Sequence, residues 1–340
     1  MLDETSSANR EASPYVPRPR LVSVAYGQTD VGRQREHNED AFAVEPEVDL
    51  FVVCDGMGGN NAGEVASALA TTSLRNFFQA TAAGPFPGAP EKGDEELSPA
   101  ARRLVYGVRK ANSDVYEISS TRSEHKGMGS TLVALHVSRD TGSVQIAHVG
   151  DSRCYRIRDG KIQQLTRDHS LVGDALAWNP NLSEEELSRL PKNIISRALG
   201  LRRVVEVDVR SEPAYPGDIY LLCSDGLSGM VRDQQLLELV MLSDSLEEAC
   251  ETLIALANEN GGTDNITALT VRVDADPSGA LVGPDIVAEP LAVEELLSYL
   301  DGTPVDGVAR AVPSVSCPSC GEVPSVGDAF CGQCGARISP

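Results

Sequence analysis

Short runs of β-branched and aliphatic residues fill the sequence between Leu21 and about Val273, and several follow one another with no helical segment between them. Each run is a strand candidate, because apolar runs of about four to eight residues bounded by turn residues favour β-structure. The candidates are LVSVAYG, DLFVVCD, GSTLVALHV, GSVQIAHVG, SRCYRIR, VVEVDV, DIYLLCSD and NITALTVRV. Strands that arrive in runs argue against a strict βαβ repeat and predict an α+β or layered α/β/β/α domain.

Helical periodicity marks four segments of the same block. They are Ala62 to Phe78, Ala100 to Ile118, Asp233 to Leu242 and Leu246 to Asn258. A stretch rich in Pro and Gly, from Thr81 to Pro99, separates the first two and predicts a long surface loop.

The two ends of the chain differ in composition from this block. Residues 1–20 are polar and contain three prolines near the end, which predicts a flexible leader. Residues 21–274 form the predicted main domain. Residues 275–315 are rich in Asp, Pro, Gly and Ala and predict a linker, with one short apolar patch, LAVEELLSYL.

Charge and apolar content exclude several classes of partner. The formal net charge is −21, whereas a protein that binds nucleic acid needs clustered Lys and Arg. The longest apolar runs span five residues, as in Leu50 to Cys54, whereas a membrane helix needs about 20. No secretory signal is readable at the N-terminus, so we expect a cytoplasmic protein that binds neither nucleic acid nor membrane. Four cysteines in or beside apolar runs suit buried thiols in a reducing compartment: Cys54, Cys154, Cys223 and Cys250.

Several aspartates directly follow predicted strands. Asp55 in VVCDGMGG and Asp225 in LLCSDG each end an apolar run and precede glycine, and Asp151 and Asp264 lie in HVGDSR and GGTDNIT. For any one motif, Asp-Gly after a strand is equally well explained as turn chemistry. If the carboxylates converge, they repel one another unless cations neutralise them, and hard oxygen ligands favour Mg2+ or Mn2+.

The motifs occur in a fixed order along the chain: R-E-H-N-E-D, D-G-M-G-G, G-M-G-S-T, H-V-G-D-S-R, D-H-S-L, I-S-R-A-L-G, S-D-G-L and T-D-N-I-T. In these motifs and their order, from about Val24 to Val273, the sequence resembles the PPM or PP2C-type metal-dependent protein phosphatases of bacteria. The resemblance implies a PP2C-like β-sandwich of two antiparallel sheets flanked by helices. It also implies hydrolysis of phosphoserine and phosphothreonine, opposing a bacterial Ser/Thr kinase.

The resemblance further implies a dinuclear Mn2+ or Mg2+ centre. The direct ligands would be Asp55 as the bridge, the Gly56 carbonyl, Asp225 and Asp264. Two metal ions about 3.5–4 Å apart lower the pKa of a bridging water, which is the expected nucleophile.

Other residues would support this centre. By the resemblance, Asp151 would help to hold a third metal ion, and Glu39 and Asp40 would act through bound water. Arg35 would grip the substrate phosphate, and the planar guanidinium fork suits two phosphate oxygens.

The general acid is not assigned. Met57 stands in D-G-M-G-G where many eukaryotic relatives have histidine, and a thioether cannot donate a proton. His37 beside the metal motif and a metal-bound water are both open alternatives. His148 and His169 are interpreted as structural histidines.

The segment of about 170–193 resembles the flap of the family, a mobile insert beside the metal centre. Ser183 and Glu186 fit a capping box that opens a short helix. Trp178, the only tryptophan, is interpreted as an apolar contact within the insert. The segment suits both a helical surface insert and a substrate-selecting lid.

Residues 316–340 contain two C-x2-C knuckles ten residues apart, at Cys317, Cys320, Cys331 and Cys334. Four such thiolates can surround Zn2+ in a tetrahedron, so the pattern resembles a short zinc ribbon with a structural Zn2+. Redox-active or disulfide-forming pairs are the alternative. A protein partner suits this acidic chain.

Three functions therefore compete. The first is an active phosphatase of phosphoproteins. The second is a pseudophosphatase that only binds phosphoproteins or scaffolds a complex; the retained Asp55, Asp225 and Asp264 argue against it. The third is a phosphatase of a small phosphorylated molecule or a dedicated regulatory partner.

Overall fold

The computed structural model describes residues 18–59, 62–82, 94–191 and 194–282. The chain divides into two compact units, Met1–Glu289 and Pro290–Pro340, and every described residue belongs to the first. Most of the predicted leader and linker, most of the predicted loop from Thr81 to Pro99, and the whole cysteine-rich segment lie outside the described residues.

One antiparallel sheet has the strand order β10-β7-β6-β4-β3, and the short strand β5 pairs with β4 beside it. Its strands are β3 (Asp40–Glu45), β4 (Leu50–Met57), β5 (Gly129–Ser130), β6 (Leu132–Ser138), β7 (Ser143–Val149) and β10 (Asp208–Pro213). In β4, consecutive side chains are buried from Leu50 to Cys54 because both faces of this sheet are covered.

The second antiparallel sheet has the order β2-β12-β11-β8-β9. Its strands are β2 (Leu21–Asp30), β8 (Arg153–Arg158), β9 (Lys161–Gln164), β11 (Ile219–Cys223) and β12 (Ile266–Ala275). A separate two-stranded pair joins β1 (Arg18–Pro19) to β13 (Leu281–Val282), so it links residues assigned by sequence to the leader and to the linker.

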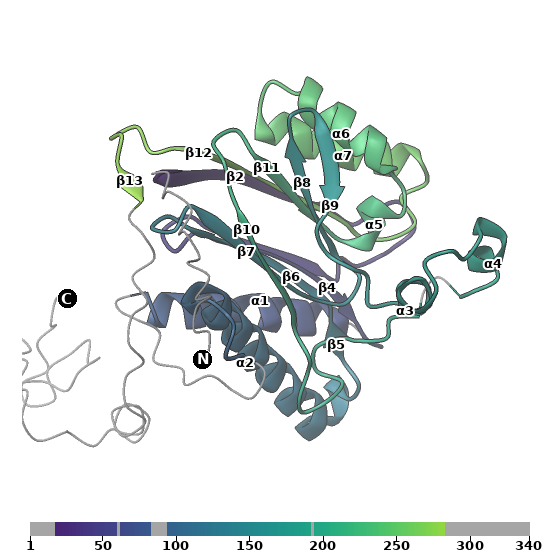
Figure 1. The fold of residues 1–340 in the computed structure, drawn as a ribbon. Helices are drawn as coiled ribbons and strands as arrows, with labels where there is room; N and C mark the ends of the chain where they lie inside the picture. Colours follow the sequence, from purple (N-terminus) through teal and green to yellow (C-terminus); the bar gives the residue numbers. More distant parts are fainter. Residues whose placement is uncertain (1–17, 60–61, 83–93, 192–193, 283–340) are drawn as a thin grey trace, which may run out of the picture. The chain divides into compact units, whose positions relative to one another are not determined.

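Helices cover the outer face of each sheet (Figure 1). The first sheet carries α1 (Ala62–Ala80) and α2 (Pro99–Thr121), and the second carries α6 (Asp233–Leu242) and α7 (Leu246–Glu259). Shorter helical segments are η1 (Ser123–His125), α3 (Leu171–Trp178), α4 (Glu184–Ser188) and α5 (Asp225–Ser228). The predicted α/β/β/α layering is thus confirmed, as are the four predicted helices.

Three apolar layers hold the sandwich together. Alternate residues of β4 show the division: Leu50 and Val52 face the layer under α1 and α2, whereas Phe51 and Val53 face the layer between the sheets. The third layer lies under α6 and α7. Apolar burial on this scale is the main stabilising term of such a domain. The four cysteines predicted as buried thiols are buried and free.

The structure differs from the sequence prediction at some strands. The strand predicted over VVEVDV is observed as β10, which starts only at Asp208, opposite His148. Before it, other side chains hold the backbone: Asn112 of α2 donates to the carbonyls of Arg202 and Arg203, just ahead of the predicted strand. Within that strand, Nη1 of Arg197 donates to the Glu206 carbonyl over 3.3 Å. Strands β3 and β9 were not predicted, because their sequences lack long apolar runs.

Helices α3 and α4, which follow Ser170, project from the sandwich (Figure 1). The capping box predicted for Ser183 and Glu186 is present at α4. The interpretation of Trp178 as an internal apolar contact is wrong, because its side chain is 92% exposed. None of the helices in the described residues has the length and apolar character that crossing a membrane requires.

Candidate metal centre

Five aspartates meet at one end of the sandwich, and both sheets contribute. Asp40 opens β3 and lies directly opposite Asp55 on β4. In the other sheet, Asp225 begins α5 two residues after the end of β11, and Asp264 stands two residues before β12. Asp151 follows β7 in the turn to β8. The structure therefore brings together every aspartate that the sequence motifs singled out.

The electrostatics of Asp55 show how closely these groups converge. Burial, and then the charges of the other four aspartates, raise the pKa of Asp55 well above its ordinary value. Burial and the neighbouring Asp264 likewise raise the pKa of Asp225. A buried cluster of like charges is unfavourable in its ionised form unless cations lie among the carboxylates.

Asp40 is held by two hydroxyl groups from the opposite sheet. The Oγ of Ser224 and the Oγ1 of Thr267 donate to its Oδ2 over 2.7 and 2.6 Å. Burial nevertheless raises the pKa of Asp40 to about 7. These two hydroxyls orient one carboxylate oxygen and leave the other, Oδ1, for a further ligand.

Unpaired carboxylate oxygens provide a test of whether this cluster suits a metal ion. Three buried carboxylate oxygens in the described residues lack any hydrogen-bond partner: Oδ1 of Asp40, of Asp151 and of Asp225. Buried polar atoms are almost always paired, so such atoms require an explanation. Hard divalent cations take oxygen ligands of this kind, and the residues therefore fit Mg2+ or Mn2+.

Asp55 and Gly56 lie on a tightly fixed backbone. Thr131 donates its amide to the Asp55 carbonyl over 2.8 Å, and its Oγ1 accepts the Asp55 amide over 2.9 Å. The Gly56 amide donates to the Glu39 carbonyl, and a Cβ at Gly56 would lie 2.0 Å from the Gly63 carbonyl oxygen. Only glycine therefore fits at position 56. Close packing, in addition to turn chemistry, explains why glycine follows Asp55.

Thr131 also reaches the Asp151 turn. Its Oγ1 lies 2.7 Å from the Oγ of Ser152, the residue after Asp151. Burial and the charge of Asp225 raise the pKa of Asp151 to about 7. The sequence analysis quoted the motif that contains Thr131 but assigned the residue no role.

Arg35 and Glu39 lie at the open edge of the cluster. The Nη2 of Arg35 donates to Oδ2 of Asp264 over 2.8 Å, and 47% of the arginine side chain is exposed. Burial raises the pKa of Glu39, and the charge of Arg35 partly offsets that effect. The guanidinium thus has one anchored nitrogen and a solvent-facing side available to an anion.

His37 lies in the same exposed loop as Arg35, and Met57 lies at the end of β4, where it pairs with Gly129. Met57 has no proton to donate, so His37 and a metal-bound water are still the two alternatives. The general acid therefore stays unassigned.

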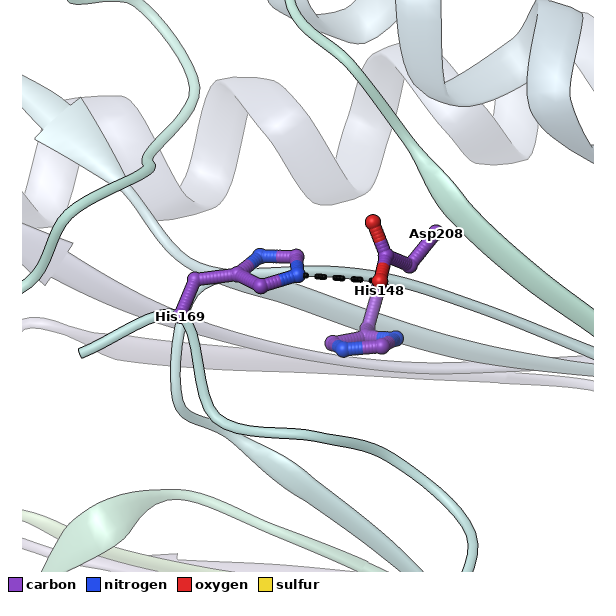
Figure 2. Close-up of side chains that lie close together, drawn as sticks. All are labelled: His148, His169 and Asp208. Atoms are coloured by element: carbon purple, nitrogen blue, oxygen red, sulfur yellow. Dashed lines mark ion pairs between the residues drawn. The ribbon is translucent and has the colours of Figure 1, made fainter. Parts of the chain in front are cut away.

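A second group of possible metal ligands, His148, His169 and Asp208, lies close together (Figure 2). Their ligand atoms fall within 4.8 Å of one another. These atoms already have partners, however: Nδ1 of His169 accepts the Gly150 amide over 3.1 Å, and its Nε2 faces Oδ2 of Asp208 at 3.3 Å.

Arg197 supplies the positive charge beside this second group, because its Nη1 donates to Oδ1 of Asp208 over 2.5 Å. Nε2 of His148 contacts the Arg167 carbonyl at 2.8 Å, and its ring stacks on His169. Burial lowers the pKa of both histidines, that of His148 to about 4. We interpret the group as a hydrogen-bonded anchor of neutral histidines, in agreement with the structural role predicted for them.

Comparison with known proteins identifies relatives of this chain. Residues 29–267 match the family described as protein phosphatase 2C. The serine/threonine phosphatase stp of Listeria monocytogenes is 37% identical over 255 residues, which cover 74% of this chain and 96% of that protein. The catalytic domain of PstP, a serine threonine protein phosphatase, solved in complex with two manganese ions, superposes with a TM-score of 0.63. The two sequences are 33% identical, and the match covers 75% of this chain and 99% of the PstP domain.

Stp1 of Staphylococcus aureus, a serine/threonine phosphatase, superposes equally well, with a TM-score of 0.63 and 32% identity. The match covers 77% of this chain and 98% of the Stp1 chain.

The raised pKa values predict how metal binding depends on pH. Asp40 and Asp151 titrate near 7 in the folded chain, above the ordinary carboxyl value of about 3.9, so protonation stabilises the metal-free fold. That contribution is present in acid and is lost as the pH rises through about 7. Mn2+ must displace these protons, so we predict that the rise in melting temperature caused by Mn2+ grows from about pH 5.5 to about pH 8.

Thermal unfolding with Mn2+ or with EDTA at both pH values checks this expectation. Asp264→Asn should lose most of the Mn2+ effect, whereas Asp159→Asn, in an exposed turn, should keep it. A larger Mn2+ effect at the lower pH would contradict the assignment of Asp40 and Asp151 to the centre.

Proposed function

This chain belongs to the protein phosphatase 2C family and is a metal-dependent serine/threonine protein phosphatase, and we propose that Asp55, Asp225 and Asp264 hold its two catalytic metal ions. The observation that carries the assignment is the convergence of buried carboxylates with unpaired oxygens at one end of the sandwich. The substrates are phosphoserine and phosphothreonine in proteins, and the enzyme would oppose a Ser/Thr kinase. We expect it to act in the cytoplasm.

Each residue has a place in this assignment. Asp55 lies opposite Asp40 and interacts electrostatically with carboxylates of both sheets, so it would suit a ligand shared by the two ions, with the Gly56 carbonyl as a further ligand. Asp151 would help to hold a third ion, and Glu39 and Asp40 would act through bound water. Mn2+ and Mg2+ both suit such oxygen ligands. When bound, the metal ions supply a water that is nucleophilic at neutral pH and positive charge next to the phosphate.

The protein itself contributes positioning and charge. Arg35 presents its guanidinium at the edge of the cluster, where it would bind two phosphate oxygens in a bidentate fashion. Ser224 and Thr267 fix the Asp40 carboxylate, and Thr131 fixes the Asp55 backbone, before substrate arrives, which removes reorganisation from the reaction.

Hydrolysis assays test the proposed activity. We predict that the full-length chain hydrolyses a phosphothreonine peptide with Mn2+ or Mg2+ and stops in EDTA. Asp225→Asn should lower kcat by at least about 100-fold, because even residues outside the ligand shell cost 10–100-fold when mutated. Asp244→Asn, an exposed aspartate before α7, is the matched control and should keep full activity.

Absence of turnover by folded, metal-loaded wild type would contradict the proposal. Binding of the phosphopeptide without turnover would then support the scaffold that the sequence analysis left as an alternative.

The segment between Ser170 and Ile195 is proposed as a substrate-selecting flap. Its two ends are tied together at the base, because the Leu171 amide donates to the Ile194 carbonyl and the Ser196 amide to the His169 carbonyl. Trp178 is almost fully exposed on this segment. Burial of such a large apolar side chain by a partner contributes strongly to the free energy of binding.

We predict that Trp178→Ala lowers kcat/KM for a phosphoprotein substrate about tenfold, the size expected for an aromatic contact residue. Hydrolysis of p-nitrophenyl phosphate, which is too small to reach the flap, should be unchanged. Leu242→Ala on α6, 80% exposed, is the control. Equal losses on both substrates would exclude a role in selecting proteins.

The cysteine-rich segment is proposed as a structural zinc ribbon that binds a protein partner. The support is the spacing of Cys317, Cys320, Cys331 and Cys334. We predict about one tightly held Zn2+ per full-length chain by elemental analysis, lost in the double variant Cys317→Ser with Cys320→Ser. A metal-free chain with two disulfides would favour the alternative reading of the cysteines.

A further inference from the structure

We propose that Asn265 is a positioning residue that closes the loop of residues 31–39 and thereby holds Arg35 where it can bind phosphate. The proposal rests on the assignment of Arg35 as the phosphate-binding residue. It adds a residue whose side-chain hydrogen bonds all go to backbone groups, and which would act through the backbone of the arginine loop.

The carboxamide of Asn265 bonds to both ends of this loop. Its Nδ2 donates to the Val31 carbonyl over 3.0 Å and to the His37 carbonyl over 2.9 Å. Its Oδ1 accepts the Glu39 amide over 2.8 Å. The three partners determine the orientation of the amide, because turning it over would set its NH2 group against an amide and its oxygen against two carbonyls.

The loop between these anchor points needs such a support. Residues 34–37 are all exposed and have no regular secondary structure, so side-chain packing contributes little to their position. Asn265 itself is only 4% exposed. A buried side chain with all its polar atoms paired is a rigid support, and it stands next to Asp264, the partner of Arg35.

Close packing joins the same two segments. The Arg33 amide donates to the Gly262 carbonyl over 2.7 Å. Gly32 has a φ of 82°, and a Cβ there would lie 2.2 Å from the Asp264 carbonyl oxygen. The start of the arginine loop therefore lies directly on the turn that carries Asp264 and Asn265.

If Asn265 acts through Arg35, removing both side chains costs little more than removing Arg35 alone. Independent residues would instead give effects that multiply. An arginine that binds the phosphate equally before and during the reaction affects KM more than kcat, and so should its positioning residue.

The chain offers a matched control in Asn112, which is 1% exposed. Its Oδ1 accepts the Gly200 amide over 3.0 Å, and its Nδ2 donates to the carbonyls of Arg202 and Arg203. Asn112 thus makes the same three kinds of hydrogen bond, but to a different loop.

The experiment measures the Kd of inorganic phosphate by calorimetry on the full-length, Mn2+-loaded chain. Wild type, Asn265→Ala, Arg35→Ala, the double variant and Asn112→Ala are compared, each with its melting temperature and its kcat and KM for a phosphothreonine peptide. Asn265→Asp, which keeps the side-chain volume but loses both donated hydrogen bonds, serves as a second variant in the same cycle.

We expect Asn265→Ala to weaken phosphate binding about tenfold, since even small misplacement of a binding group is costly. The double variant should lie within about threefold of Arg35→Ala. Asn112→Ala should lower the melting temperature but leave the phosphate Kd unchanged.

Two outcomes would overturn the role of Asn265 while leaving the phosphatase assignment intact. In one, the losses of phosphate affinity of the two single variants multiply in the double variant. In the other, Asn112→Ala loses as much phosphate affinity as Asn265→Ala. Wild type that binds phosphate but does not hydrolyse the peptide would instead contradict the proposed function, and the binding cycle would still decide the role of Asn265.

Discussion

Electrostatic repulsion among buried carboxyl groups governs the end of the sandwich at which Asp55 lies. Burial and neighbouring charge both disfavour ionised side chains there, and they raise the pKa of Asp40, Asp55, Asp151 and Asp225. A fold that keeps such groups together must resist their separation through interactions in other parts of the domain. Divalent cations among the carboxylates would turn the same arrangement from a destabilising feature into a binding site.

The two sheets supply that opposing rigidity. Adjacent strands in one ladder set Asp40 opposite Asp55, and the other ladder sets Asp225 and Asp264 at the ends of neighbouring strands. Apolar layers on both faces of each sheet fix the strands, and side-chain hydrogen bonds join the strand ends across the two sheets. Asn265 extends this pattern to the exposed loop that carries Arg35.

The sequence predicted the layers, the helices and the aspartates because each leaves a local signal: an apolar run, a helical period, or Asp-Gly after a strand. It did not predict the functions of Thr131, Ser224 and Asn265, whose partners lie far away along the chain. The start of β10 was placed too early because Arg197 holds the backbone of Glu206 and Asn112 holds the residues before Val204, contacts that leave no local signal. Likewise, a tryptophan carries no local sign of whether it is buried, and Trp178 is exposed.

The central proposal is that Asp55 would hold both metal ions, and electron paramagnetic resonance of the Mn2+-loaded chain tests it most directly. Two Mn2+ ions that share a carboxylate lie close enough for their spins to couple, and the spectrum then differs from that of separate ions. The account predicts a coupled spectrum for wild type and its loss in Asp55→Asn, with the protein still folded. A spectrum of isolated Mn2+ ions in wild type at every metal loading would contradict it.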